Sequence, residues 1–386
     1  MADLRRRFSD GKPITLKDGL LACNRFEATK DVDKIYSLQA FVTEELDQRL
    51  LANYENESVE TLYLDTAQHL LDQDYVVDIL PLAGIGHGRT YDKLPSWVVD
   101  WSRIPVIVQF SGGKGFQKHR ASGSSTSSIR PTTNRGRIVL RGFKTDGISE
   151  LGPKLIHDPK FVESPEAHIE SIKKIFKFYR EAESISKSSI IGRLREDSFW
   201  RTLIGDRVSP DGTQPQSQQP APDDFSVWNE SFRIMSRMAK SRSLDLVLES
   251  GNPWVERDDT ELASMNWELI LSLSLQGLSP DDLTKHLMEA YKFLPSMGSA
   301  CTNRMFCTTK GGFLALAPPQ TKQGDIVFIP LGAQAPFILR YHAEAAVADV
   351  GKKRPVYKLV GECYVHGMMD GEMMSDHPEI EDLILE

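Results

Sequence analysis

Cysteine is scarce in this sequence, with 4 residues among 386, and no two of them have the close spacing of a structural zinc site. So few cysteines cannot form a disulfide framework, which indicates a reducing compartment such as the cytoplasm. Long apolar runs are missing too, because no stretch approaches the roughly 18 residues that a membrane helix needs. The basic N-terminus is not followed by an apolar run. We therefore expect neither a membrane span nor a secretory signal.

Positive charge and cofactor motifs are also in short supply. The chain has 46 basic and 54 acidic side chains, a net charge of −8, which argues against nucleic acid as a partner. The glycines of Gly84 to Gly88 lack the spacing of a dinucleotide loop. A phosphate loop with Gly-Lys-Ser/Thr, a nucleophile elbow and a His-Glu-x-x-His zinc motif are all missing from the sequence. The sequence therefore predicts no cofactor and no metal.

Hydrophobic periodicity predicts an α+β fold. Its helical N-terminal and middle segments are expected to pack on a small antiparallel β-barrel-like unit, built from strands near 97–108, 137–143 and 304–366 and interleaved into one globular unit. The predicted organisation runs as follows: a helical segment at 1–93, strands at 94–152 with a flexible basic Ser/Gly loop at 111–135, a helical segment at 153–297 with a flexible Pro/Gln loop at 209–224, a C-terminal β unit at 298–372, and an acidic tail at 373–386.

Capping residues and short apolar runs predict the individual helices and strands. Helices are predicted to begin at Ser58, Ser164, Thr260 and Ser279, each followed by apolar residues at helical spacing. Five short runs bounded mostly by glycine or proline predict strands at 304–309, 313–317, 325–330, 336–341 and 356–365.

A polar cluster near the C-terminus supplies the candidate catalytic residues. In an extended strand, Glu362, Tyr364 and His366 share one face, and His366 is the best candidate for proton transfer. Glu362 and His366 would lie roughly 13 Å apart along the strand, so they do not form a ready-made acid–base pair. Asp100 is the fourth catalytic candidate. The alternative is that this face only makes cross-strand hydrogen bonds.

Aromatic and basic residues elsewhere supply candidate ligand contacts. Trp97 and Trp101 bracket Asp100 and, together with Arg340, are predicted to line a binding pocket. Structural packing of the two tryptophans is the alternative.

Several segments together resemble the fungal heterokaryon incompatibility (HET) domain protein family. They are Asp33 to Leu38, Leu94 to Ser102, Gly324 to Val327, Pro336 to Arg340 and Leu359 to Glu372. The resemblance covers about residues 15 to 372. The two signature stretches of the HET domain itself, similar to Tyr-x-x-Leu-Ser-Tyr-x-Trp-Gly and Asp-x-x-Cys-Ile-Asn-Gln, do not occur in this sequence. The resemblance therefore implies the region that follows the HET effector domain, with that core missing.

Two functions are compatible with this resemblance. The first is a recognition or regulatory module of the incompatibility system that binds a protein partner. The alternative is a cofactor-independent tailoring enzyme of fungal secondary metabolism, of the cyclase or isomerase type, acting on a hydrophobic small molecule. A recognition module should expose an apolar patch, whereas an enzyme should enclose an apolar cavity with convergent polar groups.

Overall fold

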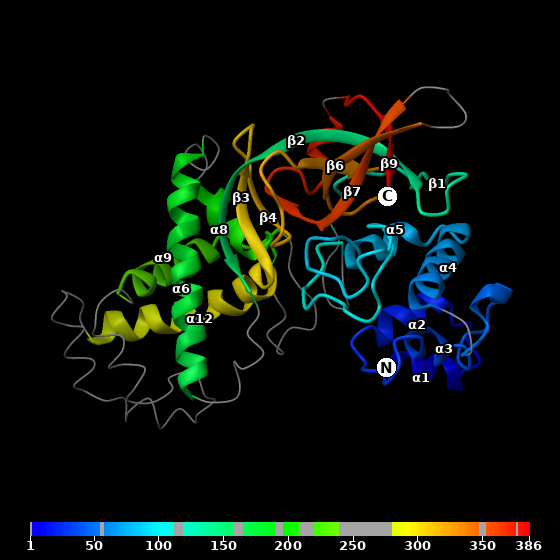
Figure 1. Ribbon diagram of the computed structural model, residues 1–386. Helices are drawn as coiled ribbons and strands as arrows, with labels where there is room; N and C mark the ends of the chain where they lie inside the picture. Colours follow the sequence, from blue (N-terminus) through cyan, green and yellow to red (C-terminus); the bar gives the residue numbers. More distant parts are fainter. Residues whose placement is uncertain are drawn as a thin grey trace. The chain divides into compact units, whose positions relative to one another are not determined.

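One long strand, β2 (Ile138–Leu155), belongs to both of the units into which the structure divides. The computed structural model describes residues 2–54, 58–111, 119–156, 165–189, 196–207, 220–238, 280–346, 353–375 and 377–386 (Figure 1). Unit 1 comprises Met1–Gly112, Lys118–Ile148 and Ala317–Glu386, and unit 2 comprises Gly113–Gln117 and Ser149–Leu316.

Unit 1 is built around a closed barrel of five strands. The first part of β2 pairs antiparallel with β5 (Ile326–Pro330) and with β9 (Glu381–Leu385). Strand β6 (Phe337–Ala346) joins β5 to β7 (Lys353–Glu362), and β7 runs parallel to β9, which closes the ring. Ile138 and Leu140 on β2 are buried while Arg141 is exposed, the alternation of a strand with one face in a core. The predicted α+β fold with a small barrel is confirmed.

The last barrel strand corrects the prediction of an acidic tail at 373–386. Strand β9 carries Glu381 and Asp382, but its Leu383, Ile384 and Leu385 are buried, and Leu383 and Leu385 belong to the hydrophobic core. Three apolar residues among acidic neighbours suffice for a strand because all three pair with β2, and Ile384 and Leu385 pair with β7 as well.

The N-terminal segment of unit 1 is helical, as predicted. Ser58 accepts a hydrogen bond from the Thr61 amide and so caps the longest of these helices, which confirms the predicted start. The other elements here are short, and the full set is α1 (Ala2–Ser9), α2 (Leu16–Cys23), α3 (Asp33–Tyr36), η1 (Gln48–Leu50), α4 (Val59–Asp72), α5 (Val76–Ile79) and η2 (Leu80–Leu82).

One hydrophobic core joins these helices to the barrel. Leu62 and Leu70 of α4 belong to the same buried cluster as Phe328 of β5, Leu359 of β7 and Leu385 of β9. The predicted packing of N-terminal helices on the barrel is thereby confirmed, and burial of this shared apolar surface is the main stabilising contribution.

The glycine-rich segment 84–88 packs closely against the backbone of β7. The amides of Ile85 and Gly86 donate to the carbonyls of Leu359 and Val360 on β7. A Cβ on Gly86 would lie 2.5 Å from the Val360 carbonyl oxygen, so only glycine permits this approach.

The strand predicted near 97–108 is wrong, because the segment forms turns and irregular structure. The Asp100 carboxylate accepts from the amides of Thr90, Tyr91 and Ser102. The Arg89 guanidinium donates to the carbonyls of Leu94, Pro95 and Val98. These two side chains satisfy backbone groups that a strand would have paired with another strand.

The flexible loop predicted at 111–135 is wrong for its described part. His119, Ala121 and Ser122 are buried, and the Ser122 amide and hydroxyl both donate to the Ala333 carbonyl. Small residues order this segment because they fit closely against neighbouring backbone. A short strand, β1 (Ile129–Pro131), then pairs with β2. Residues 112–118 lie outside the described residues.

Unit 2 contains four described helices, α6 (Pro165–Ser188), α8 (Glu196–Ile204), α9 (Phe225–Met238) and α12 (Pro280–Cys301). It also contains the strands β3 (Arg304–Thr309) and β4 (Leu314–Ala317), although Ala317, the last residue of β4, is assigned to unit 1. The Tyr179 ring of α6 contacts the Phe199 ring of α8 edge to face, with centroids 5.3 Å apart, and the tilted Phe232 ring of α9 at 5.0 Å. The predicted helices after Ser164 and Ser279 and the predicted strands 304–309 and 313–317 are confirmed. The helix predicted at Thr260 and most of the loop at 209–224 lie outside the described residues.

Candidate functional site

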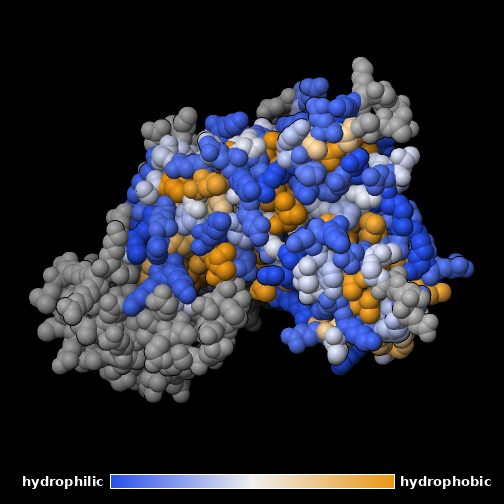
Figure 2. Space-filling view, viewed as in Figure 1, coloured by the Kyte–Doolittle hydropathy of each residue, from blue (hydrophilic) through white to orange (hydrophobic). Residues whose placement is uncertain are grey.

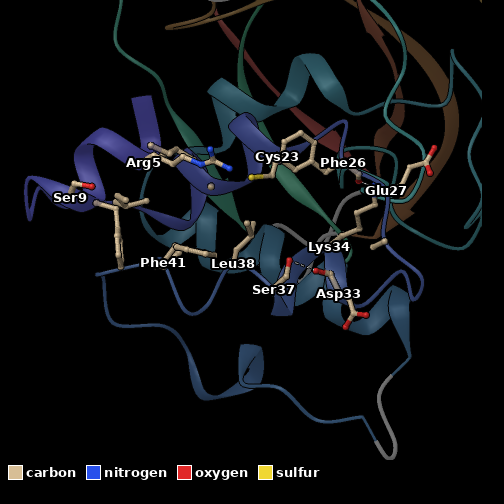
Figure 3. A pocket seen from close by; sticks show the side chains of 16 residues that line it. Arg5, Ser9, Cys23, Phe26, Glu27, Asp33, Lys34, Ser37, Leu38 and Phe41 are labelled. Carbon is tan, nitrogen blue, oxygen red and sulfur yellow. Dashed lines mark hydrogen bonds between the residues drawn. The ribbon is translucent and has the colours of Figure 1, made fainter. Parts of the chain in front are cut away.

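An apolar groove lies among the N-terminal helices of unit 1. It encloses about 540 Å³ between α1, α2, α3 and the turns that join them (Figure 3). Figure 2 shows apolar residues among polar ones on the surface of these N-terminal helices, at the lower right. The apolar side chains that line the groove are Leu4, Phe8, Ile14, Cys23, Phe26, Ala28, Leu38, Phe41 and Val42.

A capping box and an ion pair hold the walls of the groove together. Thr15 caps α2 by accepting from the Asp18 amide, and the Asp18 carboxylate accepts in return from the Thr15 amide. The same carboxylate binds the Arg7 guanidinium of α1 at 2.9 Å. Phe8 of α1 contacts Phe41 edge to face, with ring centroids 5.7 Å apart. Helix α1 is therefore fixed to α2 on one side and to the 38–42 turn on the other.

The rim of the groove exposes three phenylalanines. About half of the surface of Phe8, Phe26 and Phe41 is exposed, at 53%, 50% and 52%. Exposed aromatic rings grouped around an apolar groove mark a surface that is suited to a partner.

Four charged residues line the rim: two are hydrogen-bonded within the chain and two are not. The Lys34 ammonium donates to the Phe26 carbonyl, and the Asp33 carboxylate accepts from the Tyr54 hydroxyl at 2.8 Å. Within the ranges that the structure describes, the side chains of Arg5 and Glu27 make no hydrogen bond or ion pair. These two charges are thus available to a ligand in the groove.

Replacement of Asp18 with asparagine is expected to loosen α1 from α2 and to lower the free energy of unfolding by about 1 kcal/mol. The asparagine side chain carries no charge for Arg7 and caps less well. Urea unfolding at neutral pH measures the effect. Asp10→Asn is the matched control, because the Asp10–Lys12 pair is exposed and is expected to contribute little.

The effect of Asp18→Asn should also depend on pH. Burial opposes ionisation of Asp18, but the hydrogen bonds from Arg7 and the Thr15 backbone outweigh it and hold the pKa of this carboxyl below its usual 3.8. A carboxyl with a lowered folded-state pKa stabilises the fold above its usual pKa and loses that contribution as the pH falls through the folded-state value. The difference between wild type and variant should therefore disappear in acid. A difference that stays constant down to pH 2 would contradict this assignment.

The predicted catalytic cluster is buried at the end of β7 and in β8 (Tyr364–Val365). The Glu362 carboxylate accepts from the amides of Phe110 and Ser111, both at 2.7 Å, and from the Ser111 hydroxyl. The Tyr364 hydroxyl lies 3.1 Å from Nδ1 of His366. The structure thus brings Tyr364 and His366 together and engages Glu362 with a backbone turn.

Sequence reasoning missed two neighbours of this cluster, Phe110 and His119. The rings of Phe110 and His119 lie 5.4 and 5.8 Å from the Tyr364 ring. Nδ1 of His119 lies 3.7 Å from the Asp370 carboxylate. His119 comes from a segment of small and polar residues without periodicity, so no signal in the sequence could have placed it here.

The remaining predicted site residues each have other contacts. Asp100 organises the turns described above, and Trp97 donates from Nε1 to the Gly136 carbonyl at 3.0 Å. Trp101 is buried. Arg340 forms a two-pronged ion pair with Asp325, both contacts being 2.8 Å. The catalytic and ligand-binding roles of these residues stay predictions.

A second, polar pocket of about 320 Å³ lies in unit 1 beside the 92–96 segment. Its lining includes Lys93, Arg137, Lys358 and Glu386, and Arg137 is paired with Glu386. Neither this pocket nor the N-terminal groove is lined by the predicted site residues. Within the described ranges, no group of three or more His, Cys, Asp or Glu side chains could hold a metal ion, and no helix has the length and apolarity to cross a membrane.

These features define a barrel protein with a helical N-terminal segment and an exposed apolar groove. The model of the Het-6 β-barrel domain family matches residues 136–385. The chain belongs to this family, which confirms the resemblance to HET proteins.

A curated relative extends the match beyond the barrel. The chain is 23% identical over 389 residues to heterokaryon incompatibility protein 6, OR allele, of Neurospora crassa. The match covers 92% of this chain and 51% of the relative, so the chain spans about half the length of that protein. No solved structure matches the chain.

Proposed function

We propose that this chain is a recognition module of the heterokaryon incompatibility system that binds a protein partner. The observation that carries the proposal is the groove, whose rim exposes Phe8, Phe26 and Phe41 around apolar walls. Burial of such rings on association supplies favourable free energy without any catalytic group. The similarity to heterokaryon incompatibility protein 6 supports the same biological setting.

We also propose a cytoplasmic location, where partners from two fused hyphae would meet. None of the four cysteines forms a disulfide, which is compatible with a reducing compartment.

The double variant Phe8→Ser, Phe41→Ser is expected to abolish the incompatibility reaction. Both rings are half-exposed, so their replacement removes contact area for a partner, and the Arg7–Asp18 ion pair still holds α1 to α2. The measurement is hyphal viability after fusion between fungal strains that do or do not carry the gene. Tyr341→Ser is the matched control, since this aromatic residue is 58% exposed on the barrel, away from the groove lining. A double variant with a full reaction, at wild-type protein level, would count against the recognition role.

A further inference from the structure

The backbone around the groove lacks a sheet edge to which an extended ligand could add as a strand. Peptides that bind as an added strand need a sheet edge with unpaired amides and carbonyls. The described lining residues come from α1, α2, α3 and their connecting turns, and none of them lies in a strand. Amides and carbonyls in a helix bond within that helix, which leaves side chains as the main contact surface.

The apolar walls of the groove suit a helical ligand. An α-helix satisfies its own backbone and can present apolar side chains at positions i, i+4 and i+7, which matches an apolar groove.

The free charges at the rim add a constraint on the ligand. Figure 3 shows Arg5 and Glu27 on opposite sides of Cys23, with Leu38 and Phe41 nearer the Arg5 side. Neither charge has a partner within the described part of the chain. A ligand that crosses the groove therefore passes the unpaired side chains of Arg5 and Glu27, separated by apolar surface, in addition to Lys34 and Asp33, which are hydrogen-bonded within the chain.

We infer that the groove binds an amphipathic α-helix of the partner protein, with an apolar face flanked by an acidic residue toward Arg5 and a basic residue toward Glu27. The inference rests on the proposed function, because it specifies the partner segment that a recognition module would hold. Apolar contacts provide most of the affinity, and the two charges select among apolar helices.

The test uses the full chain and synthetic peptides of about 18 residues, long enough to form a helix. One peptide has a leucine face with glutamate at one end and lysine at the other, and a second has lysine at both ends. A third matches the first but carries two central prolines. Binding is measured by fluorescence anisotropy. The binding site is checked with a version of the first peptide in which one leucine of the apolar face is replaced by a cysteine activated as a mixed disulfide. This peptide should form a disulfide with Cys23 in the groove, whereas Cys301, Cys307 and Cys363 are buried. Cys23→Ser is the control for the label.

The first peptide should bind more tightly than the second by about threefold, the usual size of an exposed charge contact. Arg5→Glu should reverse this preference, whichever way the helix lies in the groove. Phe8→Ser should weaken binding about tenfold, because the variant loses an aromatic contact with the ligand, whereas Tyr341→Ser should not. The prolines should abolish binding.

Equal binding of the proline peptide, labelling that survives Cys23→Ser, or a charge preference that Arg5→Glu leaves unchanged would overturn the inference. The hyphal fusion assay tests the recognition role separately. Peptide binding without any effect of the groove variants on fusion would refute the proposed function and leave the helix site standing.

Discussion

Replacement of Leu385 with alanine is expected to lower the free energy of unfolding by about 2 to 5 kcal/mol. Leu385 is fully buried and lies where the barrel closes, opposite Ile138 of β2 and Tyr357 of β7. Truncation of its side chain leaves a cavity between two strand pairings that the barrel cannot easily collapse. Urea unfolding followed by circular dichroism measures the loss, and hydrogen exchange of residues 138–147 shows whether it occurs in the barrel.

Ile380→Ala is the matched control for this variant. Ile380 immediately precedes β9 and is 36% exposed, so its truncation should cost less than about 1 kcal/mol. If Leu385→Ala were as stable as this control, β9 would not be part of the barrel core.

Glu362→Gln is expected to destabilise the chain by about 3 kcal/mol. Both carboxylate oxygens of Glu362 accept hydrogen bonds, from the Phe110 amide on one and from Ser111 on the other. In glutamine an NH₂ group, which cannot accept a hydrogen bond, replaces one of the two carboxylate oxygens. One buried donor is then left without its acceptor. The turn at 110–111 should therefore loosen. Its amides should exchange with solvent faster than in the wild type.

Glu344→Gln provides the comparison, because Glu344 is exposed on β6 and its replacement should change stability by less than about 0.5 kcal/mol. Unchanged unfolding and unchanged exchange at 110–111 in Glu362→Gln would contradict the structural role of this carboxylate.

Much of the fold could be predicted because local signals agree with it. Strand β3 was predicted residue for residue at 304–309, and the Ser58 cap marks the start of α4. In both cases the information lies within a few residues of the chain: a short apolar run bounded by turns, or a hydroxyl followed by helical spacing.

The failures share a different cause, since contacts distant in sequence decide them. The turns at 94–101 depend on Arg89 and Asp100, whose hydrogen bonds to backbone no periodicity reveals. Strand β9 depends on pairing with β2 and β7, and its acidic residues conceal the short apolar run.

The candidate site was the least predictable part. The sequence directed attention to Glu362, Tyr364 and His366, which form a buried polar cluster. The groove depends on Phe8, Phe26 and Phe41, three separate residues on helix ends and turns. They share no spacing pattern, and it is the packing of α1 against α2 and of Phe8 against Phe41 that brings them to one rim.

The position of β9 in the chain constrains the order in which the protein can fold during synthesis. Unit 2 comes mainly from one continuous span, Ser149–Leu316, so its contacts can form as soon as that span has left the ribosome. The barrel begins with residue 138 but cannot close before residues 381–385 have been translated. Until then the edges of β2 and β7 lack their partner, and exposed strand edges promote association between chains. Nascent barrels of this kind should therefore depend on chaperones for longer than the helical unit does.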